Sequence, residues 1–168
     1  AESLTEALSK IGFQASFWTL EVILPVGISF YTFHGLSYVI DIYKNRIEPE
    51  RNVVTYSLFV SYFPLLVAGP IERATHLLPQ IKKQRIFNYY LAVQGVKQII
   101  WGLFKKVVVA DNCAFFVNQI FENPSSHSAT ELWIGMFLFS FQIYGDFSGY
   151  SDIALGTSKL FGIDLLRN

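Results

Sequence analysis

The chain has 168 residues, and only 15% of them are Asp, Glu, Lys or Arg, whereas a soluble domain carries roughly 25%. The formal net charge is zero, so bulk charge gives no reason to expect a nucleic-acid partner. With 17% aromatic residues, the composition suits either a membrane protein or an unusually apolar soluble one. The spacing of the charges along the chain distinguishes these two classes.

The two ends of the chain predict a piece of a longer protein. Residues 1–16 are polar and amphipathic, and they lack the basic and apolar regions of a signal peptide. The chain begins with Ala1 rather than Met and ends at residues 165–168 without a terminating composition. We therefore expect residues 1–168 to be part of a single domain that continues at both ends.

Two uncharged stretches are long enough to cross a bilayer. Residues 22–40 and residues 52–71 contain nineteen and twenty residues without a formal charge, and a helix of either length reaches roughly the 30 Å of a bilayer core. Residues 98–121 and residues 132–158 are apolar with a few embedded charges. Polar connectors occupy residues 41–51, 72–88 and 122–131. The pattern predicts an all-α integral membrane protein with several spans.

The second uncharged stretch is expected to be broken or re-entrant. Basic residues flank it on both sides, so a single crossing would leave one basic loop on the wrong side of the membrane. These residues are Lys44, Arg46 and Arg51 before the stretch and Arg73, Lys82, Lys83 and Arg85 after it. Pro64 and the pair Gly69 and Pro70 favour a break, because proline removes a backbone donor and clashes with the preceding turn. A loop that violates the positive-inside rule is the alternative.

The segment FQIYGDFSGYSD, residues 141–152, is the strongest candidate for chemistry. Asp146 and Asp152 lie in an otherwise apolar sequence. An intramembrane carboxylate costs roughly 2.5–3.5 kcal/mol, so each is expected to face the protein interior or a cavity. On a helix the two Asp do not share a face, whereas Ser148 and Asp152 do. The substrate-tunnel wall interpreted from this segment consists of Asp146, Ser148, Tyr150, Ser151 and Asp152.

A purely structural interpretation of the same segment is equally consistent with the sequence. Gly145 and Gly149 form a G-x-x-x-G pair, which lets another helix approach closely. The polar residues around them would then hold two helices together rather than bind a substrate. Both interpretations remain open at this point.

Lys105 and Lys106 interrupt an apolar region. Neither lies three or four residues from Asp111, so a simple intrahelical ion pair is not expected. Either both lysines extend to the lipid headgroups, or they contact a phosphate-bearing ligand such as an acyl donor or a lipid head.

Gly69 and Pro70 predict a turn at the membrane edge, followed by an ion pair between Glu72 and Arg73. The alternative is that this backbone lines the tunnel, with Gly69, Pro70 and Arg73 as wall residues. His34 is either a polar tunnel residue or a histidine satisfied by hydrogen bonds. Its candidate partners are Ser29, Tyr31, Thr32 and Tyr38.

No metal site is expected from the sequence. His34, His76 and His127 are far apart and show no metal-ligand spacing. Cys113 is the only cysteine, so an internal disulfide is impossible and a cysteine-based metal cluster is not expected.

Four strings, in this order, resemble the membrane-bound O-acyltransferase family and, within it, the bacterial alginate O-acetyltransferase branch. They are LPVGISFYTFHGLSYVIDIY (residues 24–43), SYFPLLVAGPIER (residues 61–73), GLFKKVVVADN (residues 102–112) and FQIYGDFSGYSDIALGTSKLFG (residues 141–162). Relatives of this branch include the D-alanyl transfer protein of teichoic acid synthesis. The branch usually carries a bulkier residue at Gly145, so the glycine is expected to loosen the helix there.

The resemblance implies a multi-pass enzyme of the inner, or cytoplasmic, membrane. Such an enzyme passes an acetyl or other short acyl group from a thioester to hydroxyl groups of an exported polysaccharide such as alginate. The co-substrate would be acetyl-coenzyme A or a carrier-bound acyl group, with no tightly bound cofactor. The lipid bilayer and other polysaccharide-acetylation proteins on the outer side would be its partners.

The resemblance also implies where the catalytic base lies. A hydroxyl needs a positioned group to accept its proton, and in this family that group is a histidine in a Trp-His context. No Trp-His pair occurs in the sequence, so the base is expected beyond Asn168, none of the histidines is assigned to catalysis, and residues 1–168 alone are expected to be inactive. Two rival classes remain: a transporter or channel, which also has broken helices and buried acids, and a structural assembly subunit without chemistry.

Overall fold

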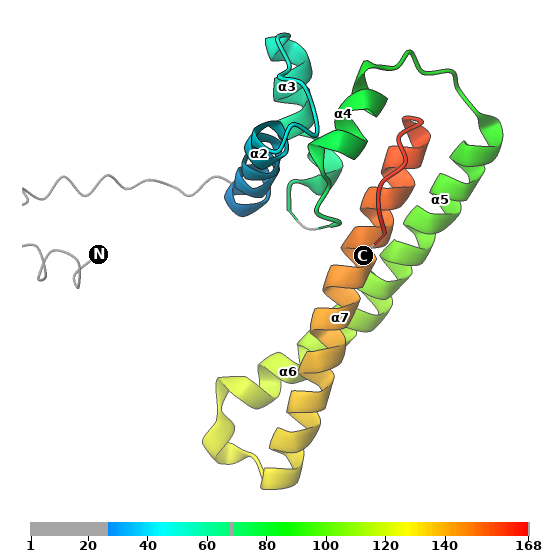
Figure 1. Ribbon diagram of the computed structural model, residues 1–168. Helices are drawn as coiled ribbons and strands as arrows, with labels where there is room; N and C mark the ends of the chain where they lie inside the picture. Colours follow the sequence, from blue (N-terminus) through cyan, green and yellow to red (C-terminus); the bar gives the residue numbers. More distant parts are fainter. Residues whose placement is uncertain (1–26, 68, 168) are drawn as a thin grey trace, which may run out of the picture.

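The computed structural model describes residues 27–67 and 69–167, and every regular element in them is helical. The two longest α-helices, α5 (Tyr89–Leu103) and α7 (Ala129–Leu160), lie side by side and run in opposite directions (Figure 1). A smaller group of helices packs near the C-terminal end of α7 (Figure 1). The predicted all-α class is therefore confirmed for the described part of the chain.

The smaller group is built from three short α-helices and a single 3₁₀ turn. They are α2 (Ile28–Tyr43), α3 (Val53–Val60), η1 (Phe63–Leu65) and α4 (Ala74–Lys82). The side chain of Asn52 starts α3 by accepting hydrogen bonds from the backbone N–H groups of Val54 and Thr55, at 2.9 and 3.3 Å. Such a side-chain cap satisfies donors that the first turn of a helix leaves unpaired.

The predicted break in residues 52–71 is confirmed. Helix α3 ends at Val60, Pro64 lies in the short 3₁₀ helix η1, and the next α-helix in the described part of the chain begins at Ala74. Gly69 has φ of 130°, a backbone conformation that side-chain-bearing residues rarely adopt. Proline and glycine thus end the helix where the sequence indicated that they would.

None of the helices in residues 27–67 and 69–167 is both long enough and apolar enough for a membrane crossing. The first uncharged stretch, residues 22–40, overlaps α2, and the second, residues 52–71, is divided between α3 and η1 as its predicted break implies. Helix α2 has 16 residues and α3 has eight, and α3 ends before Pro64. Residues 22–26 of the first stretch lie outside the described residues.

The connector predicted at residues 72–88 is partly wrong, because it contains α4. Four apolar residues of this helix follow helical spacing and are buried: Ala74, Leu77, Leu78 and Ile81. They belong to one core that also contains Phe59, Leu65 and, from the C-terminal segment, Ile163 and Leu165. The amphipathic period was a usable signal for this helix.

The second half of the chain folds as a helical hairpin. After α5 the backbone winds as a π-helix, η2 (Phe104–Ala110), and continues as α6 (Asp111–Glu122). A 3₁₀ turn, η3 (Pro124–Ser126), leads into α7, which begins with a capping box between Ser128 and Glu131. Helix α7 runs through Gly145 without interruption, so the expected loosening of the helix at that glycine is not observed.

The loop between α2 and α3 is tied to α4 by Glu50. Its carboxylate pairs with Lys82 and accepts a 2.9 Å hydrogen bond from the Asn52 N–H group. The Tyr38 hydroxyl accepts a hydrogen bond from the Glu50 N–H group at 2.7 Å. The hydrogen bond from Lys82, supported by the Asn52 N–H group, holds the pKa of Glu50 below its ordinary value of 4.5.

Acid will therefore loosen this loop. Because the folded-state pKa of Glu50 is lowered, its contacts contribute fully above the unfolded value near 4.5, and this contribution is lost as the pH falls through the lowered folded value. The melting temperature of the full-length protein, followed from about pH 6 to pH 3, should fall less in Glu50→Gln than in the wild type. The matched control is Glu48→Gln, at an exposed carboxylate of the same loop. An equal pH dependence in wild type and Glu50→Gln would contradict the prediction.

Candidate functional site

Helices α5 and α7 approach each other closely at facing glycines. A Cβ atom on Gly102 would lie 2.5 Å from the carbonyl oxygen of Gly149, and a Cβ atom on Gly156 would lie 2.5 Å from that of Gly95. Gly145 faces the π-helix, where a Cβ atom would lie 3.0 Å from the Ala110 Cβ. The close helix contact predicted from Gly145 and Gly149 is therefore confirmed, and three further glycines take part in it.

The π-helix directs two adjacent lysines toward α7. A π-helix contains an extra residue per turn and often marks a functional site. Here it follows Gly102 and ends at Ala110, both of which pack against α7. As a result, Lys105 and Lys106 reach the two different faces of α7 that carry Asp152 and Asp146.

Lys105 lies at the centre of a polar cluster between α5 and α7. Its Nζ donates to Asp152 Oδ2 at 2.5 Å and to Ser148 Oγ at 2.7 Å. The other Asp152 oxygen, Oδ1, accepts from Gln98 Nε2 at 3.0 Å, and Gln98 Oε1 accepts from Lys159 Nζ at 2.7 Å. This polar ladder, defined here as Lys105, Ser148, Asp152, Gln98 and Lys159, follows the contact between the two helices.

The ladder confirms one prediction and corrects another. Ser148 and Asp152 share a face, since both contact the same ammonium group. The idea that Lys105 extends to lipid headgroups is wrong, because only 16% of its side chain is exposed and its ammonium group is paired with Asp152. Whether either lysine also contacts a phosphate stays a prediction.

Lys106 forms a second, more exposed group of charges. Its Nζ lies 2.6 Å from both Asp146 Oδ1 and Asp111 Oδ1. The expectation that neither lysine could pair with Asp111 is wrong, because the wider π-helical turn brings residues five apart onto the same face. The intrahelical pair and the interhelical pair therefore share one ammonium group.

Cavities open on both sides of α7 next to these charges. One, of about 500 Å³, is lined by members of the polar ladder together with Ser151, Tyr144 and Arg167. The other, of about 440 Å³, is lined by Lys106, Asp146, Tyr150 and Val67, with apolar residues of α7. All five α7 residues of the predicted tunnel wall thus border one of two cavities, and both lysines do as well.

The broken segment before α4 reaches the second cavity. The Val67 N–H group donates a 3.4 Å hydrogen bond to the Tyr150 hydroxyl. A Cβ atom on Gly69 would lie 3.7 Å from Ala154 of α7. Pro70 is buried, whereas Arg73 is exposed, so the structure brings Gly69 to α7 and leaves the Arg73 side chain on the surface.

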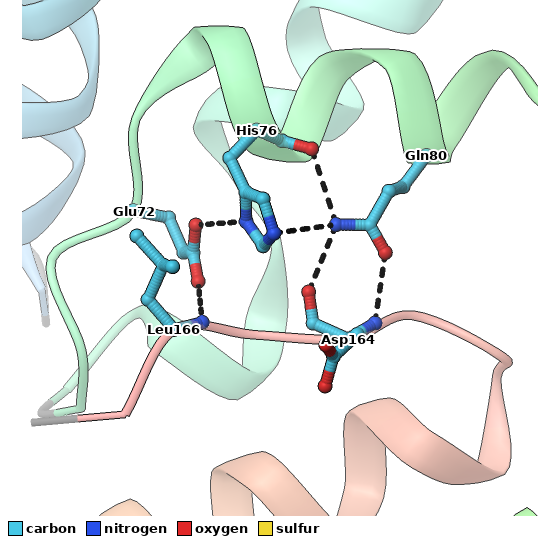
Figure 2. A network of polar contacts seen from close by, with 5 residues as sticks. All are labelled: Glu72, His76, Gln80, Asp164 and Leu166. Carbon is cyan, nitrogen blue, oxygen red and sulfur yellow. Dashed lines mark hydrogen bonds and ion pairs between the residues drawn. The ribbon is translucent and has the colours of Figure 1, made fainter.

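The predicted ion pair between Glu72 and Arg73 is wrong. Glu72 is fully buried, and its Oε2 accepts a 2.8 Å hydrogen bond from His76 Nδ1. Its other oxygen accepts a hydrogen bond from the Leu166 N–H group. Gln80 adds two further hydrogen bonds of 2.8 Å, to the N–H and C=O groups of Asp164 (Figure 2). This network holds the C-terminal segment against α4. Glu72, His76 and Gln80 follow one another at intervals of four residues, about one helical turn.

His34 lies away from the charged cluster. It is 1% exposed on α2 and packs 5.9 Å, centroid to centroid, from Phe59. No hydroxyl group among the described residues is hydrogen-bonded to either ring nitrogen, so the interpretation of His34 as satisfied by neighbouring hydroxyl groups is wrong. Its part in a tunnel stays a prediction.

The site is built from charges and hydroxyl groups. No group of three or more His, Cys, Asp or Glu side chains in residues 27–67 and 69–167 could hold a metal ion. The paired lysines and carboxylates can instead orient hydroxyl and carbonyl groups by hydrogen bonds. The sequence did not identify Gln98 and Lys159 as site residues, because an isolated polar residue in an apolar helix does not reveal its partner.

Known proteins resemble the chain over nearly its whole length, although no family model matches it. The protein named "Probable alginate O-acetylase" of Pseudomonas aeruginosa is 36% identical over 169 residues, which cover 99% of this chain and 32% of that protein. The peptidoglycan O-acetyltransferase of Helicobacter pylori is 36% identical over 181 residues, which cover 92% of this chain and 34% of that protein. The chain is therefore similar to acyl-transfer proteins, in keeping with the resemblance that its four strings indicated.

A more distant relative extends the same comparison. The teichoic acid D-alanyltransferase of Bacillus subtilis is 25% identical over 147 residues, which cover 85% of this chain and 37% of that protein. The relatives named as alginate O-acetylases confirm the resemblance to that branch. The chain spans about a third of the length of the curated relatives that it matches.

Proposed function

We propose that the chain is part of a membrane-bound O-acyltransferase that moves an acetyl or other short acyl group from a thioester donor to hydroxyl groups of an exported polysaccharide. The observation that carries this proposal is the 36% identity, over 99% of the chain, to a relative named as an alginate O-acetylase. A peptidoglycan O-acetyltransferase matches equally well. The two names share the chemistry of acyl transfer to a sugar hydroxyl.

The surface of the helical hairpin supports a location in the cytoplasmic membrane, with several crossings in the whole protein. Large apolar side chains are exposed along α7, including Trp133, Phe137 and Phe141, each with more than half of its surface accessible. A soluble monomer rarely exposes a contiguous apolar surface of this kind. We propose that lipid and the remainder of the protein cover these side chains.

The proposed role of the charged cluster is to form part of the tunnel wall. The Lys105–Asp152 and Lys106–Asp146 pairs stand next to cavities of about 500 and 440 Å³. A fixed ammonium group can donate to the thioester carbonyl oxygen, and a carboxylate can accept from the acceptor hydroxyl. The general base that removes the hydroxyl proton would come from a part of the protein beyond residues 1–168.

The proposal is tested with the full-length protein in membrane vesicles. Vesicles supplied with radiolabelled acetyl-coenzyme A and the exported polysaccharide should form labelled, hydroxylamine-sensitive esters at a rate proportional to the amount of the protein. Vesicles without the protein are the control. Ion or solute flux without ester formation would instead support a transporter. The absence of both flux and ester formation would support an assembly subunit.

A further inference from the structure

The connection between α4 and α5 carries basic residues followed at once by exposed apolar ones. Lys83 and Arg85 precede Ile86 and Phe87, and Tyr89 and Tyr90 open α5. Ile86 is 87% exposed and Phe87 is 73% exposed. Tyr89 and Tyr90 are 76% and 70% exposed. None of the chemistry proposed above uses this segment, which lies at the opposite end of the hairpin from α6 (Figure 1).

Two adjoining cavities lie beside this segment, with volumes of about 340 and 280 Å³. Both are lined by Arg85, Ile86 and Asn88 from the connection, by Leu91 of α5 and by Gly162 at the end of α7. Lys83 lines the first cavity, and Lys159 lines the second. No acidic side chain is among the residues that line either cavity.

The positive charge at these cavities is not neutralised by the described residues. Lys82 is paired with Glu50, but Lys83, Arg85 and Lys159 are in none of the ion pairs formed within residues 27–67 and 69–167. The partner of Lys159 is the uncharged Gln98 amide. The nearest acid in the C-terminal segment, Asp164, is exposed and does not line either cavity.

We propose that this surface binds an anionic phospholipid. The headgroup phosphate would lie between Lys83, Arg85 and Lys159, and the acyl chains would run along Ile86 and Phe87. Basic side chains next to a bilayer attract anionic headgroups, and exposed aromatic and aliphatic residues beside them suit the lipid interface. A free phosphate ion would use the same cations but would leave the exposed apolar side chains without a role. The proposal rests on the membrane location proposed above, but it does not depend on acyl transfer.

The test uses the full-length protein with a photoreactive benzoylphenylalanine in place of Ile86, reconstituted in vesicles with equal mole fractions of phosphatidylglycerol and phosphatidylcholine. Illumination should crosslink phosphatidylglycerol in clear excess over phosphatidylcholine. Lys83→Ala with Arg85→Ala should reduce that excess by about tenfold, given the attraction expected for each basic residue near an anionic surface. The matched control removes two exposed charges from the other loop, by Lys44→Ala with Arg51→Ala, and should keep the excess.

Three results would overturn the proposal. Equal crosslinking of the two lipids would remove the headgroup preference. Crosslinking of the photoreactive group to another part of the protein would show that the surface is an internal packing surface. Loss of the lipid crosslink on adding inorganic phosphate would show a site for a soluble anion. Because the readout is a crosslink and not ester formation, failure here is distinguishable from failure of the proposed acyl transfer.

Discussion

Lys105→Met will destabilise the full-length protein by about 2–3 kcal/mol, and Asp152→Asn will have a similar effect. Each change leaves one charge of a mostly enclosed pair without its partner, and breaking such a pair costs several kcal/mol when it is fully buried. The side chains of Lys105 and Asp152 are 16% and 19% exposed, so we expect less than the full effect. Ser148 and Gln98 also lose a charged hydrogen-bonding partner.

The double variant Lys105→Met/Asp152→Asn should recover most of the lost stability. Removing both charges eliminates the uncompensated one, so the melting temperature of the purified protein in detergent should return toward the wild-type value. Lys97→Met, at an exposed position of α5, is the control for charge removal alone. If the double variant melts no higher than either single variant, the two groups do not depend on each other.

Gly102→Ala will separate α5 from α7 and destabilise the protein by about 2 kcal/mol or more. The added Cβ atom would lie 2.5 Å from the backbone oxygen of Gly149 and 2.8 Å from Ile153 Cγ1. A backbone atom cannot turn aside as a flexible side chain can, so the helices must move apart. The Lys105 contacts with Ser148 and Asp152 span the same interface and would lengthen with it.

Gly35→Ala provides the matched control for this prediction. The nearest atom to a Cβ at Gly35 is the Tyr56 hydroxyl oxygen, at 4.0 Å. Alanine is the better helix former by about 1 kcal/mol, so this variant should be as stable as the wild type or more stable. A melting temperature for Gly102→Ala equal to that of Gly35→Ala would mean that the α5–α7 contact is looser than described here.

Local signals in the sequence account for the broken second stretch and for the glycine contact. Proline and glycine act on their own backbone, so Pro64 and Gly69 could be interpreted without knowing the fold. The spacing of Gly145 and Gly149 likewise predicts that another helix packs closely against this one. In the structure Gly149 faces Gly102, and Gly156 faces Gly95. The two glycines of each helix are seven residues apart, but matching one pair to the other requires the tertiary structure.

Other features depend on contacts that the sequence does not display. Helix α4 contains Pro79 and several polar residues, so its composition resembled a connector although its buried face had helical spacing. The π-helix has no local signature, and without it the pairing of Lys106 with Asp111 could not be inferred. The partners of Glu72 are His76, four residues further along the chain, and the distant Leu166. The sequence had suggested the adjacent Arg73 instead.

The acyl-transfer activity of the double variant Lys105→Met/Asp152→Asn tests the central claim most directly. The measurement is acetate incorporated into polysaccharide per unit of folded, membrane-resident full-length protein. If the charged pair acts in the transfer, activity will fall at least about tenfold, which corresponds to roughly 1.4 kcal/mol of lost transition-state stabilisation, even though stability has been regained. Near-normal activity per folded protein would contradict a role of the pair in acyl transfer. It would show that the pair only holds α5 against α7.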